Sequence, residues 1–507
     1  MKSDIKKTLA LFLCVLLLFS FIACGNADTT GKSETADGQN SSAEEKETPA
    51  EDSADNKLYT SYLTPEDFSG EEFRIYTSNS INGLKLITTL NYGEEETGEV
   101  VNDALVARDR WLEETYKVEL SFTVDDSTAK ASIAGMLNKL VLAGDDVYDA
   151  VIEDVAQVAK GMTMAGTAYS MSEVPSADLS AGYWMPEINE QLKIGGKSYF
   201  TASSISPRFY GSAYIIMFNR DLASNLGIND LYDLVIGDKW TTDKLMEYSR
   251  LGVADIDGDA QITGKDQIGM FYEVLTPEAL VMGAGYHYVE NIGGELKIML
   301  EDQGLQSYMD KLSRFFQEEG IFWTNDKGFS ESDTINNGTY LFFNPCTFNL
   351  AEFRDLDYDY GILPMPKRDE AQEHYISYAQ PWVVAVPVVP ATVTGEKLNM
   401  TGVMLNAMAA YGYDYLRPAI YENVIQLKGT RDEQSAAIVN QLFDHVTFEL
   451  AAILRFGSFD DKINAYFTNN LGKQDIASLY ASLKSSAEGE IEKILNTYAD
   501  LEQARKG

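Results

Sequence analysis

The chain has little cysteine, little histidine and little positive charge. Three cysteines and three histidines occur in 507 residues, and 78 acidic residues outnumber 40 basic ones, which gives a formal net charge of −38. Nucleic acids and anionic membranes attract basic surfaces, so this charge argues against either as a partner. Cys14 and Cys24 lie near the N-terminus, which leaves Cys346 alone in the body of the chain. No internal disulfide is therefore expected there.

Common enzyme motifs are missing as well. The histidines, His287, His374 and His445, have no metal-binding spacing such as HExxH, and the sequence contains no GxSxG elbow, P-loop or dinucleotide fingerprint. We therefore expect a protein that is not an enzyme. Because carboxylates are too numerous to exclude a glycoside hydrolase by counting, a secreted hydrolase stays an alternative. A surface adhesin that does not take part in transport is the other.

The N-terminus has the pattern of a secretory signal peptide. Lys2, Lys6 and Lys7 precede an apolar run over residues 9–22, which is shorter than the roughly 20 residues of a membrane-spanning helix. Residues 21–24, Phe-Ile-Ala-Cys, resemble a lipobox, which predicts cleavage of residues 1–23 and a diacylglyceryl group on Cys24. An ordinary signal peptide beside a chance cysteine is the alternative. The expected location is the outer face of the cytoplasmic membrane, with the lipid as the sole membrane contact.

Residues 24–57 are predicted to form a disordered tether. From residue 25 to residue 57 there is no Val, Ile, Leu, Met or aromatic side chain. Such a segment buries too little apolar surface to offset the loss of chain entropy on folding. As a flexible coil its root-mean-square reach is on the order of 30 Å.

The rest of the chain alternates between strand and helix patterns, which predicts an α/β protein. Predicted strands cover residues 72–77, 117–124, 147–152, 213–218 and 268–272, and two further apolar stretches cover residues 339–343 and 383–389. Predicted helices cover residues 101–116, 132–142, 242–252 and 305–318, and several amphipathic helices are expected between residues 435 and 505. Ligand sites in such sheets lie beyond the C-terminal ends of the strands.

Seven short motifs, in order, resemble those of the family 1 extracellular solute-binding proteins, the maltose-binding-protein type. They are GEVVNDA at residues 98–104, YDAV at 148–151, FNRDL at 218–222, WTTDK at 240–244, NGTYLF at 337–342, YGILPMPK at 360–367 and KGTRDE at 428–433. The resemblance covers nearly all of residues 72–501. It implies a monomeric receptor that hands a solute to the permease of an ABC importer.

The same resemblance implies a two-lobed fold of the periplasmic-binding-protein type, type II, with a ligand cleft between lobes that crossing strands join. Lobe 1 would comprise residues 58–212 and about 380–420, and lobe 2 residues 213–379 and about 421–507. The chain would cross near Tyr214 and return near Trp382. A ligand that contacts both lobes would stabilise the closed state.

The expected solute is a carbohydrate, an oligosaccharide, because aromatic faces and carboxylates suit sugar rings and hydroxyls. Maltodextrin is doubtful, because Phe348 is the nearest aromatic residue where some sugar binders carry a tryptophan. Core packing stays an alternative for Trp184 and Trp382, and a solvated loop for the acidic pair. The candidate ligand-binding residues are Glu153, Asp154, Tyr183, Trp184, Arg208, Tyr210, Glu273, Tyr286, Phe348 and Trp382.

One acidic segment has the spacing of an EF-hand calcium loop. Asp255, Asp257, Asp259, Gln261 and Asp266 stand at loop positions 1, 3, 5, 7 and 12, where oxygen ligands are needed. Two positions depart from the pattern, since position 6 is alanine rather than glycine and position 12 is aspartate rather than glutamate. The segment predicts a structural Ca²⁺ of modest affinity, with an Asp/Gly-rich turn as the alternative. No catalytic cofactor is expected.

Overall fold

A computed structural model describes residues 58–78, 91–93, 95–125, 130–326, 328–353, 355–426, 433–455, 459–468 and 475–506. The predicted signal peptide, Cys24 and the tether through residue 57 lie outside these residues. Within the described ranges, no helix is long and apolar enough to cross a membrane.

The first sheet contains three parallel strands and one antiparallel strand. Its order is β12-β3-β1-β2, with β1 parallel to β2 and β3, and β12 antiparallel to β3. The strands are β1 (Glu71–Ser78), β2 (Val118–Asp125), β3 (Ala150–Asp154) and β12 (Ala385–Val388). Parallel neighbours need a crossover, which α2 (Val100–Tyr116) and α3 (Lys130–Ala143) supply.

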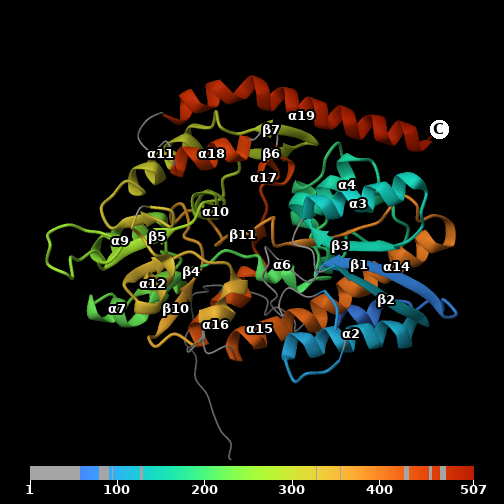
Figure 1. Cartoon of the computed structure of the whole chain (residues 1–507), viewed down its shortest axis with the longest axis horizontal. Coiled ribbons are helices and arrows are strands. Elements are labelled where there is room, and N and C mark those ends of the chain that lie inside the picture. Colours follow the sequence, from blue (N-terminus) through green and yellow to red (C-terminus); the bar gives the residue numbers. More distant parts are fainter. Residues whose placement is uncertain are drawn as a thin grey trace, which may run out of the picture. The chain divides into compact units, whose positions relative to one another are not determined.

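Helices cover both faces of this sheet (Figure 1). Phe73 and Ile75 of β1 pack into a core cluster with Met404 of α14 (Gly395–Tyr411), whereas Tyr76 packs into a second cluster with Ile133 of α3. Alternate side chains of a strand point to opposite faces, so one strand feeds both cores.

The second sheet has the order β10-β4-β9-β5-β8. β5 is parallel to β8 and β9, and β4 is antiparallel to β9 and β10. The strands are β4 (Ile216–Asn219), β5 (Ile268–Tyr272), β8 (Ile321–Trp323), β9 (Tyr340–Phe343) and β10 (Tyr360–Leu363). Every residue of β4, β5, β9 and β10 is buried, as expected for a sheet that is covered on both faces.

Further helices and a hairpin surround the two sheets (Figure 1). Before and between the strands of the second sheet they are α4 (Lys160–Met164), α5 (Pro186–Gln191), α6 (Pro207–Gly211), α7 (Arg220–Asn225), α8 (Leu231–Ile236), α9 (Thr242–Leu251), α10 (Thr276–Gly283), the hairpin β6 (Val289–Ile292) and β7 (Glu295–Ile298), α11 (Gln303–Phe315), α12 (Glu331–Asn337) and α13 (Leu350–Phe353). After α14 follow α15 (Arg417–Gln426), α16 (Glu433–Leu442), α17 (Leu450–Leu454), α18 (Phe459–Thr468) and α19 (Ile476–Lys506).

Two chain segments run side by side between the sheets, and a third joins them. Tyr214 N donates to Tyr378 O at 2.9 Å, and Gln380 N donates to Ser212 O at 3.0 Å. The strand β11 (Ser377–Tyr378) also pairs in parallel with β13 (Val446–Thr447), which the sequence did not predict. These three segments form the connection on which any hinge motion between the sheets would depend.

The predicted α/β class is confirmed, and the differences from the predicted elements are local. The strand expected at residues 213–218 begins at Ile216, because Ala213 and Tyr214 make isolated bridges with the neighbouring segments instead. The strand expected at residues 147–152 ends later, at Asp154, so that the acidic pair belongs to β3 itself.

Candidate functional site

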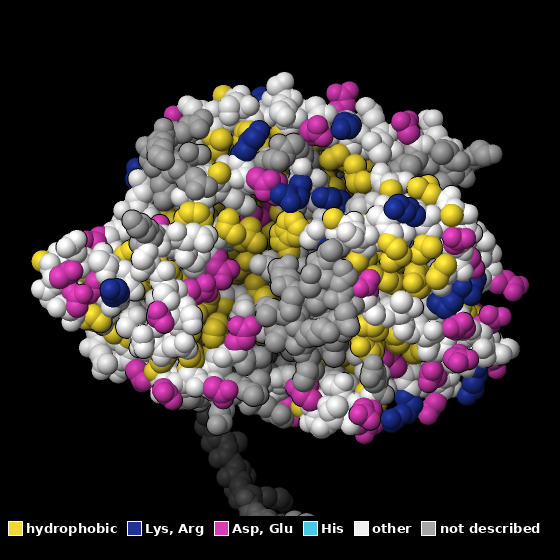
Figure 2. Space-filling view, in the orientation of Figure 1, with side chains coloured by type: hydrophobic (Ala, Val, Ile, Leu, Met, Phe, Trp, Pro, Cys, Tyr) yellow, Lys and Arg dark blue, Asp and Glu magenta, His cyan; other side chains and the backbone are white. Residues whose placement is uncertain are grey.

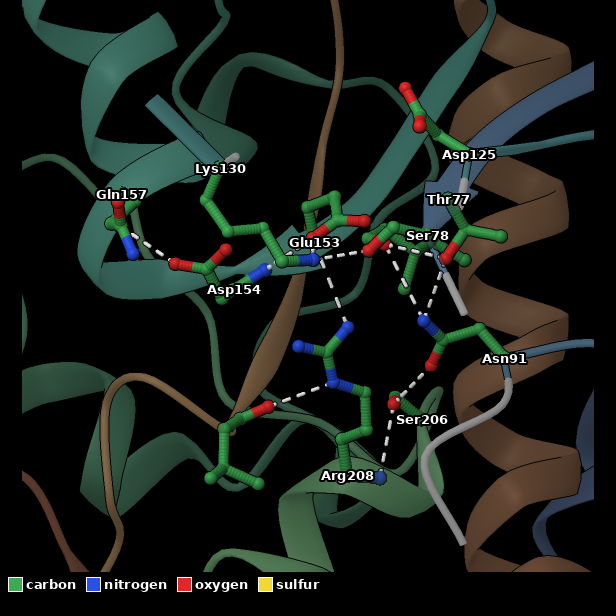
Figure 3. Close-up of polar contacts among 12 residues, drawn as sticks. Thr77, Ser78, Asn91, Asp125, Lys130, Glu153, Asp154, Gln157, Ser206 and Arg208 are labelled. Atoms are coloured by element: carbon green, nitrogen blue, oxygen red, sulfur yellow. Dashed lines mark hydrogen bonds and ion pairs between the residues drawn. The ribbon is translucent and has the colours of Figure 1, made fainter. Parts of the chain in front are cut away.

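A buried group of charged side chains lies where β1 and β3 end. Because the two strands are parallel, their C-terminal ends meet at one edge of the sheet. Ser78 ends β1, Glu153 and Asp154 end β3, Lys130 begins α3, and Arg208 lies on α6. All five side chains are almost completely buried. Figure 3 shows Lys130 and Arg208 reaching Glu153 from different sides.

Glu153 is the centre of this group. Lys130 Nζ lies 3.0 Å from Glu153 Oε2, and Arg208 Nη1 lies 3.8 Å from the same oxygen. Lys130 also donates to Ser78 Oγ. Buried charges persist when they are paired in this way, since removing an isolated ion from water is costly. The carboxylate therefore holds two cations at the strand ends.

The local sequence accounts for the position of Arg208. Ser206 Oγ accepts from Arg208 N at 3.1 Å and caps α6, while Pro207 occupies the first helical position. Arg208 Nε donates to Val383 O at 2.8 Å. Neither Nη1 nor Nη2 has a hydrogen-bond partner within the described part of the chain. Buried donors are normally satisfied by protein, water or ligand, so these two nitrogens mark a place where a ligand oxygen would be stabilised.

Asp154 supplies an acceptor beside these donors. Its Oδ1 accepts from Gln157 N at 2.8 Å, which caps the π-helical turn Val155–Ala159. Its Oδ2, and likewise Glu153 Oε1, lacks a hydrogen-bond partner among the residues that the structure describes. Burial, and secondly the charge of Glu153, raises the pKa of Asp154 to about 6, against the opposing effect of Arg208 and Lys130. Unpaired donors and acceptors thus adjoin, which suits hydroxyl groups because each hydroxyl both donates and accepts.

The frame around this group is fully hydrogen-bonded. Asn91 Nδ2 donates to Thr77 Oγ1 at 2.8 Å, and Ser206 Oγ donates to Asn91 Oδ1 (Figure 3). Arg108 contrasts with Arg208, because all of its polar contacts are made: Nε to Asp109, Nη1 to Ile205 O and Nη2 to Asn91 O. Of these two buried arginines, only Arg208 has guanidinium nitrogens without a hydrogen-bond partner among the described residues.

The half-buried Trp382 lies next to the end of β3. Ala156 N donates to Pro381 O at 3.3 Å, and Val155 N donates to Val384 O at 3.1 Å. The two residues after Asp154 are therefore bonded to the backbone just before and just after Trp382. The guanidinium of Arg455 lies 5.3 Å from the centroid of the Trp382 ring. This distance suits a cation–π contact.

Arg455 and its neighbours extend the charged group. Arg455 Nε lies 3.4 Å from Asp460 Oδ2. Burial, and secondly the charge of Asp461, raises the pKa of Asp460 to about 6. Burial and Arg455 lower the pKa of Lys160, while Asp460 and Asp154 oppose that effect, so Lys160 is electrostatically coupled to both groups. Figure 2 shows hydrophobic side chains near the middle of this face, with Lys and Arg side chains above them.

Glu273 lies at the end of β5 in the second sheet. Burial, and secondly the charge of Glu331, raises the pKa of Glu273 to about 7. Burial raises the pKa of Tyr214 and of the Cys346 thiol, and the charge of Glu273 adds to both shifts, so Glu273 lies beside the connecting segments. This position agrees with a site between the sheets, but no described contact joins Glu273 to Glu153 or Arg208.

Three of the predicted aromatic ligands belong to the core instead. Trp184 is fully buried, and its Nε1 donates to Asn406 Oδ1 at 2.9 Å. Tyr183 is 4% exposed and packs in the same cluster, while the Tyr210 hydroxyl lies 2.6 Å from Ser204 Oγ. Their expected place in the cleft is therefore corrected to packing, because a polar, turn-rich sequence does not reveal that neighbouring helices cover it.

Tyr286 and Phe348 lie apart from the charged group. The Arg368 guanidinium lies 5.1 Å from the centroid of the Tyr286 ring, and the Tyr308 ring lies 5.6 Å away. Phe348 lies in the short 3-10 turn Thr347–Asn349 and packs against the core beside Gly211. No described contact brings either of them to Asp154 or Arg208.

Sequence reasoning missed Lys130, Lys160, Arg455 and Asp460. Lys130 had one available signal, because it begins a helix after a strand, at the edge where ligand sites form. Arg455 follows the last residue of α17 and has a left-handed backbone, with φ +51°. Asp460 lies in the first turn of α18. Nothing in their local sequence distinguishes them from solvated charges.

The predicted calcium loop is partly formed. Carboxylate oxygens of Asp255, Asp257 and Asp259 lie within 4.8 Å of one another, and all three residues are exposed. Asp266 instead accepts from Ile256 N at 3.0 Å and from Thr263 N at 2.8 Å. These bonds lower the pKa of Asp266 and use its oxygens to close the loop. Asp255, Asp257 and Asp259 likewise accept from backbone amides of the loop, so all four carboxylates close an Asp/Gly-rich turn. The first three also lie close enough together to hold a hard cation.

Comparison with known proteins identifies the fold. No protein-family model matches the chain, and no curated protein matches its sequence. An uncharacterized protein from Listeria monocytogenes superposes with a TM-score of 0.54 at 10% identity, over 83% of this chain and 100% of that one. An ABC substrate-binding protein from Listeria monocytogenes in complex with cycloalternan gives a TM-score of 0.51 at 10% identity, over 84% and 99% of the two chains.

UgpB from Mycobacterium tuberculosis, in complex with glycerophosphocholine, gives a TM-score of 0.50 at 12% identity over 84% of this chain and 98% of that chain. At these identities the superpositions establish the fold alone. The resemblance inferred from the seven motifs is confirmed at that level. The chain has the periplasmic-binding-protein fold, with two mixed sheets, of the ABC-transporter solute-binding proteins.

Proposed function

We propose that this protein is the receptor of an ABC importer and captures an oligosaccharide between its two sheets. The observation that carries the proposal is the set of buried, unpaired polar atoms on Glu153, Asp154 and Arg208 at the strand ends of a solute-binding-protein fold. Buried polar atoms are normally paired with protein, water or a ligand, and a group of them at the strand ends of such a fold favours a ligand.

The chemistry of the site favours a hydroxylated solute. Arg208 Nη1 and Nη2 would donate to ligand oxygens, while Glu153 Oε1 and Asp154 Oδ2 would accept from hydroxyls. Trp382 offers a half-buried aromatic face next to them. The ABC substrate-binding protein from Listeria monocytogenes was solved in complex with cycloalternan, whereas UgpB was solved in complex with glycerophosphocholine. The similar structures alone therefore leave the class of solute open.

Closure would follow from contacts that the solute makes with both sheets. Glu273, with a pKa raised to about 7, is the candidate from the second sheet. A ligand held by Glu273 and Arg208 together binds the closed form better than the open form, which is the condition for a population shift. The permease would then recognise the closed form.

We also propose the anchor and the metal that the sequence predicts. A diacylglyceryl group on Cys24 and the tether through residue 57 would hold the receptor at the outer face of the cytoplasmic membrane, near its permease. Replacement of Cys24 by alanine should release the protein into the medium, as measured by fractionation. Ca²⁺ at Asp255, Asp257 and Asp259 would brace a surface loop, a structural role remote from the solute.

The test is a melting-temperature screen with α- and β-linked oligosaccharides, peptides and phosphodiesters. A specific solute at 100 times its dissociation constant adds about 2.7 kcal/mol of stability, a shift that such a screen detects. A shift with oligosaccharides alone, absent in the Arg208→Met variant, supports the proposal. Shifts with peptides or phosphodiesters alone contradict the carbohydrate assignment, and release of reducing ends from the same sugars would favour the hydrolase alternative.

A further inference from the structure

All three histidines of the chain line a single cavity of about 510 Å³. The cavity lies where α5, β6 and the strand β13 meet, so it borders the connection between the sheets. His287, His374 and His445 come from three separate parts of the sequence. The solute site described above does not involve this cavity.

Two of these histidines stack on each other. The ring centroids of His374 and His445 lie 4.3 Å apart, and the ring planes differ by 7°. His374 precedes β11 and His445 precedes β13, the two paired strands of the connection. Ser377 N donates to His445 O and Ala379 N to Thr447 O, both at 2.9 Å. The ring pair therefore adjoins the first hydrogen bond of the β11–β13 pairing.

The charges around the pair are mixed. His374 Nε2 lies 3.6 Å from Glu373 Oε1, and the side chain of His374 is 53% exposed. Asp444 Oδ1 forms an ion pair at 2.8 Å with Arg417 Nη1. Partial burial, and secondly His374, lowers the pKa of His445, while Asp444, Glu187 and Glu373 oppose that effect.

The parallel stacking argues against a shared metal ion. A metal bound by two imidazoles needs nitrogen lone pairs that converge, and rings that are parallel within 7° direct them side by side. Among the described residues, the cluster suited to a metal is the aspartate group at Asp255, and the histidine cavity does not provide one. Protonation is the remaining chemistry that this pair performs.

We infer that His374 and His445 form a proton-sensitive latch on the connection between the sheets, stacked when neutral and repelled when both are charged. The inference rests on the proposed function only in that this connection serves as the hinge of solute capture. Two imidazolium rings at this distance repel each other, so acid weakens the first bond of the β11–β13 pairing. Mild acidity would then loosen the hinge.

The direction of the pH effect follows from linkage. A histidine whose pKa is lower in the folded chain than its ordinary value of about 6.5 binds its proton more tightly in the unfolded chain. Its stabilising contribution is therefore complete above pH of about 6.5 and declines as the pH falls below that value. The latch is closed at neutral pH and opens on acidification.

His287 offers a matched control within the same cavity. Its Nδ1 lies 3.5 Å from Glu449 Oε2, and its Nε2 lies 3.3 Å from Thr447 Oγ1, so its hydrogen-bond partners differ from those of the stacked pair. Replacement of His287 removes one histidine and leaves the stacked pair in place.

The test is an NMR titration of the three histidines in the whole protein, which needs no solute. Two unit charges 4.3 Å apart in water change a pKa by roughly 0.7 units. His374→Asn should raise the apparent pKa of His445 by about that amount, and His287→Asn should leave it unchanged. Melting curves identify any variant that fails to fold, and His374→Gln then takes the place of His374→Asn.

Hydrogen exchange supplies the structural readout. Protection of the Ser377 and Ala379 amides should fall at least threefold between pH 7.5 and pH 5.5 in the natural protein, and should stay constant in the His374→Asn/His445→Asn variant. Independent titration of the two rings, or equal loss of protection in the double variant, overturns the latch. A zinc-dependent shift of both resonances at equimolar metal would also overturn it in favour of a metal site. All these outcomes are separate from the solute screen.

Discussion

Arg208 of α6 and Arg108 of α2 are both fully buried, and their replacement by methionine should affect stability differently. Arg208→Met removes one hydrogen bond, from Nε to Val383 O, which contributes about 1 kcal/mol. It also removes two buried donors that lack partners among the described residues, each of which costs roughly 1–3 kcal/mol. Glu153 loses its ion pair with Arg208 at 3.8 Å but keeps the closer one with Lys130 at 3.0 Å. The free energy of unfolding should therefore fall by less than about 1 kcal/mol, or rise.

The solute affinity of the same variant should fall sharply. Charge-assisted hydrogen bonds contribute roughly 1.5–3 kcal/mol each, so loss of one or two of them weakens binding at least about tenfold. Arg108→Met is the control, because it breaks bonds to Asp109, Ile205 and Asn91 and leaves a buried carboxylate without its partner. That change should cost about 3–5 kcal/mol.

Urea unfolding measures the stability of the two variants, and calorimetric titration with the solute found in the screen measures affinity. Equal destabilisation by both substitutions would refute the reasoning, since it would mean that Arg208 is satisfied within the fold. Unchanged affinity in the Arg208→Met variant would place the solute elsewhere.

Three further predictions concern the strand end, the loop and the tryptophans. Burial raises the pKa of Asp154 to about 6 from an ordinary 3.8, so the Asp154 carboxylate makes the folded protein less stable as the pH rises from about 4 to 6. Asp154→Asn should therefore raise the free energy of unfolding by up to about 3 kcal/mol at pH 7.5 and by little at pH 4. Urea unfolding at the two pH values measures the difference. Chelation of Ca²⁺ should lower the melting temperature of the natural protein and leave that of the Asp257→Ala variant unchanged. The metal is excluded if neither chelation nor Asp257→Ala alters the melting temperature. Trp184→Phe should lower the free energy of unfolding by roughly 1–3 kcal/mol without changing solute affinity. Trp382→Leu should lower solute affinity and leave stability nearly unchanged. Melting curves and calorimetric titration of both variants measure the two quantities.

The sequence predicted most of the sheet elements well, because periodicity is a local signal. The strand predicted at residues 268–272 matches β5, and the helix predicted at residues 101–116 differs from α2 by one residue. The strand β13 was missed because two residues carry no periodicity, and its pairing with β11 depends on a segment about 70 residues away.

The candidate site was predictable only in part. Glu153 and Asp154 were proposed from the end of a predicted strand, and Arg208 from its position before the expected crossing strand, and the structure brings Arg208 within 3.8 Å of Glu153. Trp184 and Trp382 could not be told apart, since a tryptophan in a turn-rich segment reads the same whether a helix covers it or a cleft exposes it. Burial by distant residues such as Asn406 decided that question.

The chain by itself determined the α/β class, the order of its elements and the acidic strand end, all of which follow from local composition and from the geometry of parallel strands. Tertiary structure alone decided which charges lack partners, which aromatic residues are core, and that His374 and His445 stack across the connection. The physical reason is that pairing, desolvation and stacking act over a few ångströms between residues far apart in sequence, where periodicity carries no information.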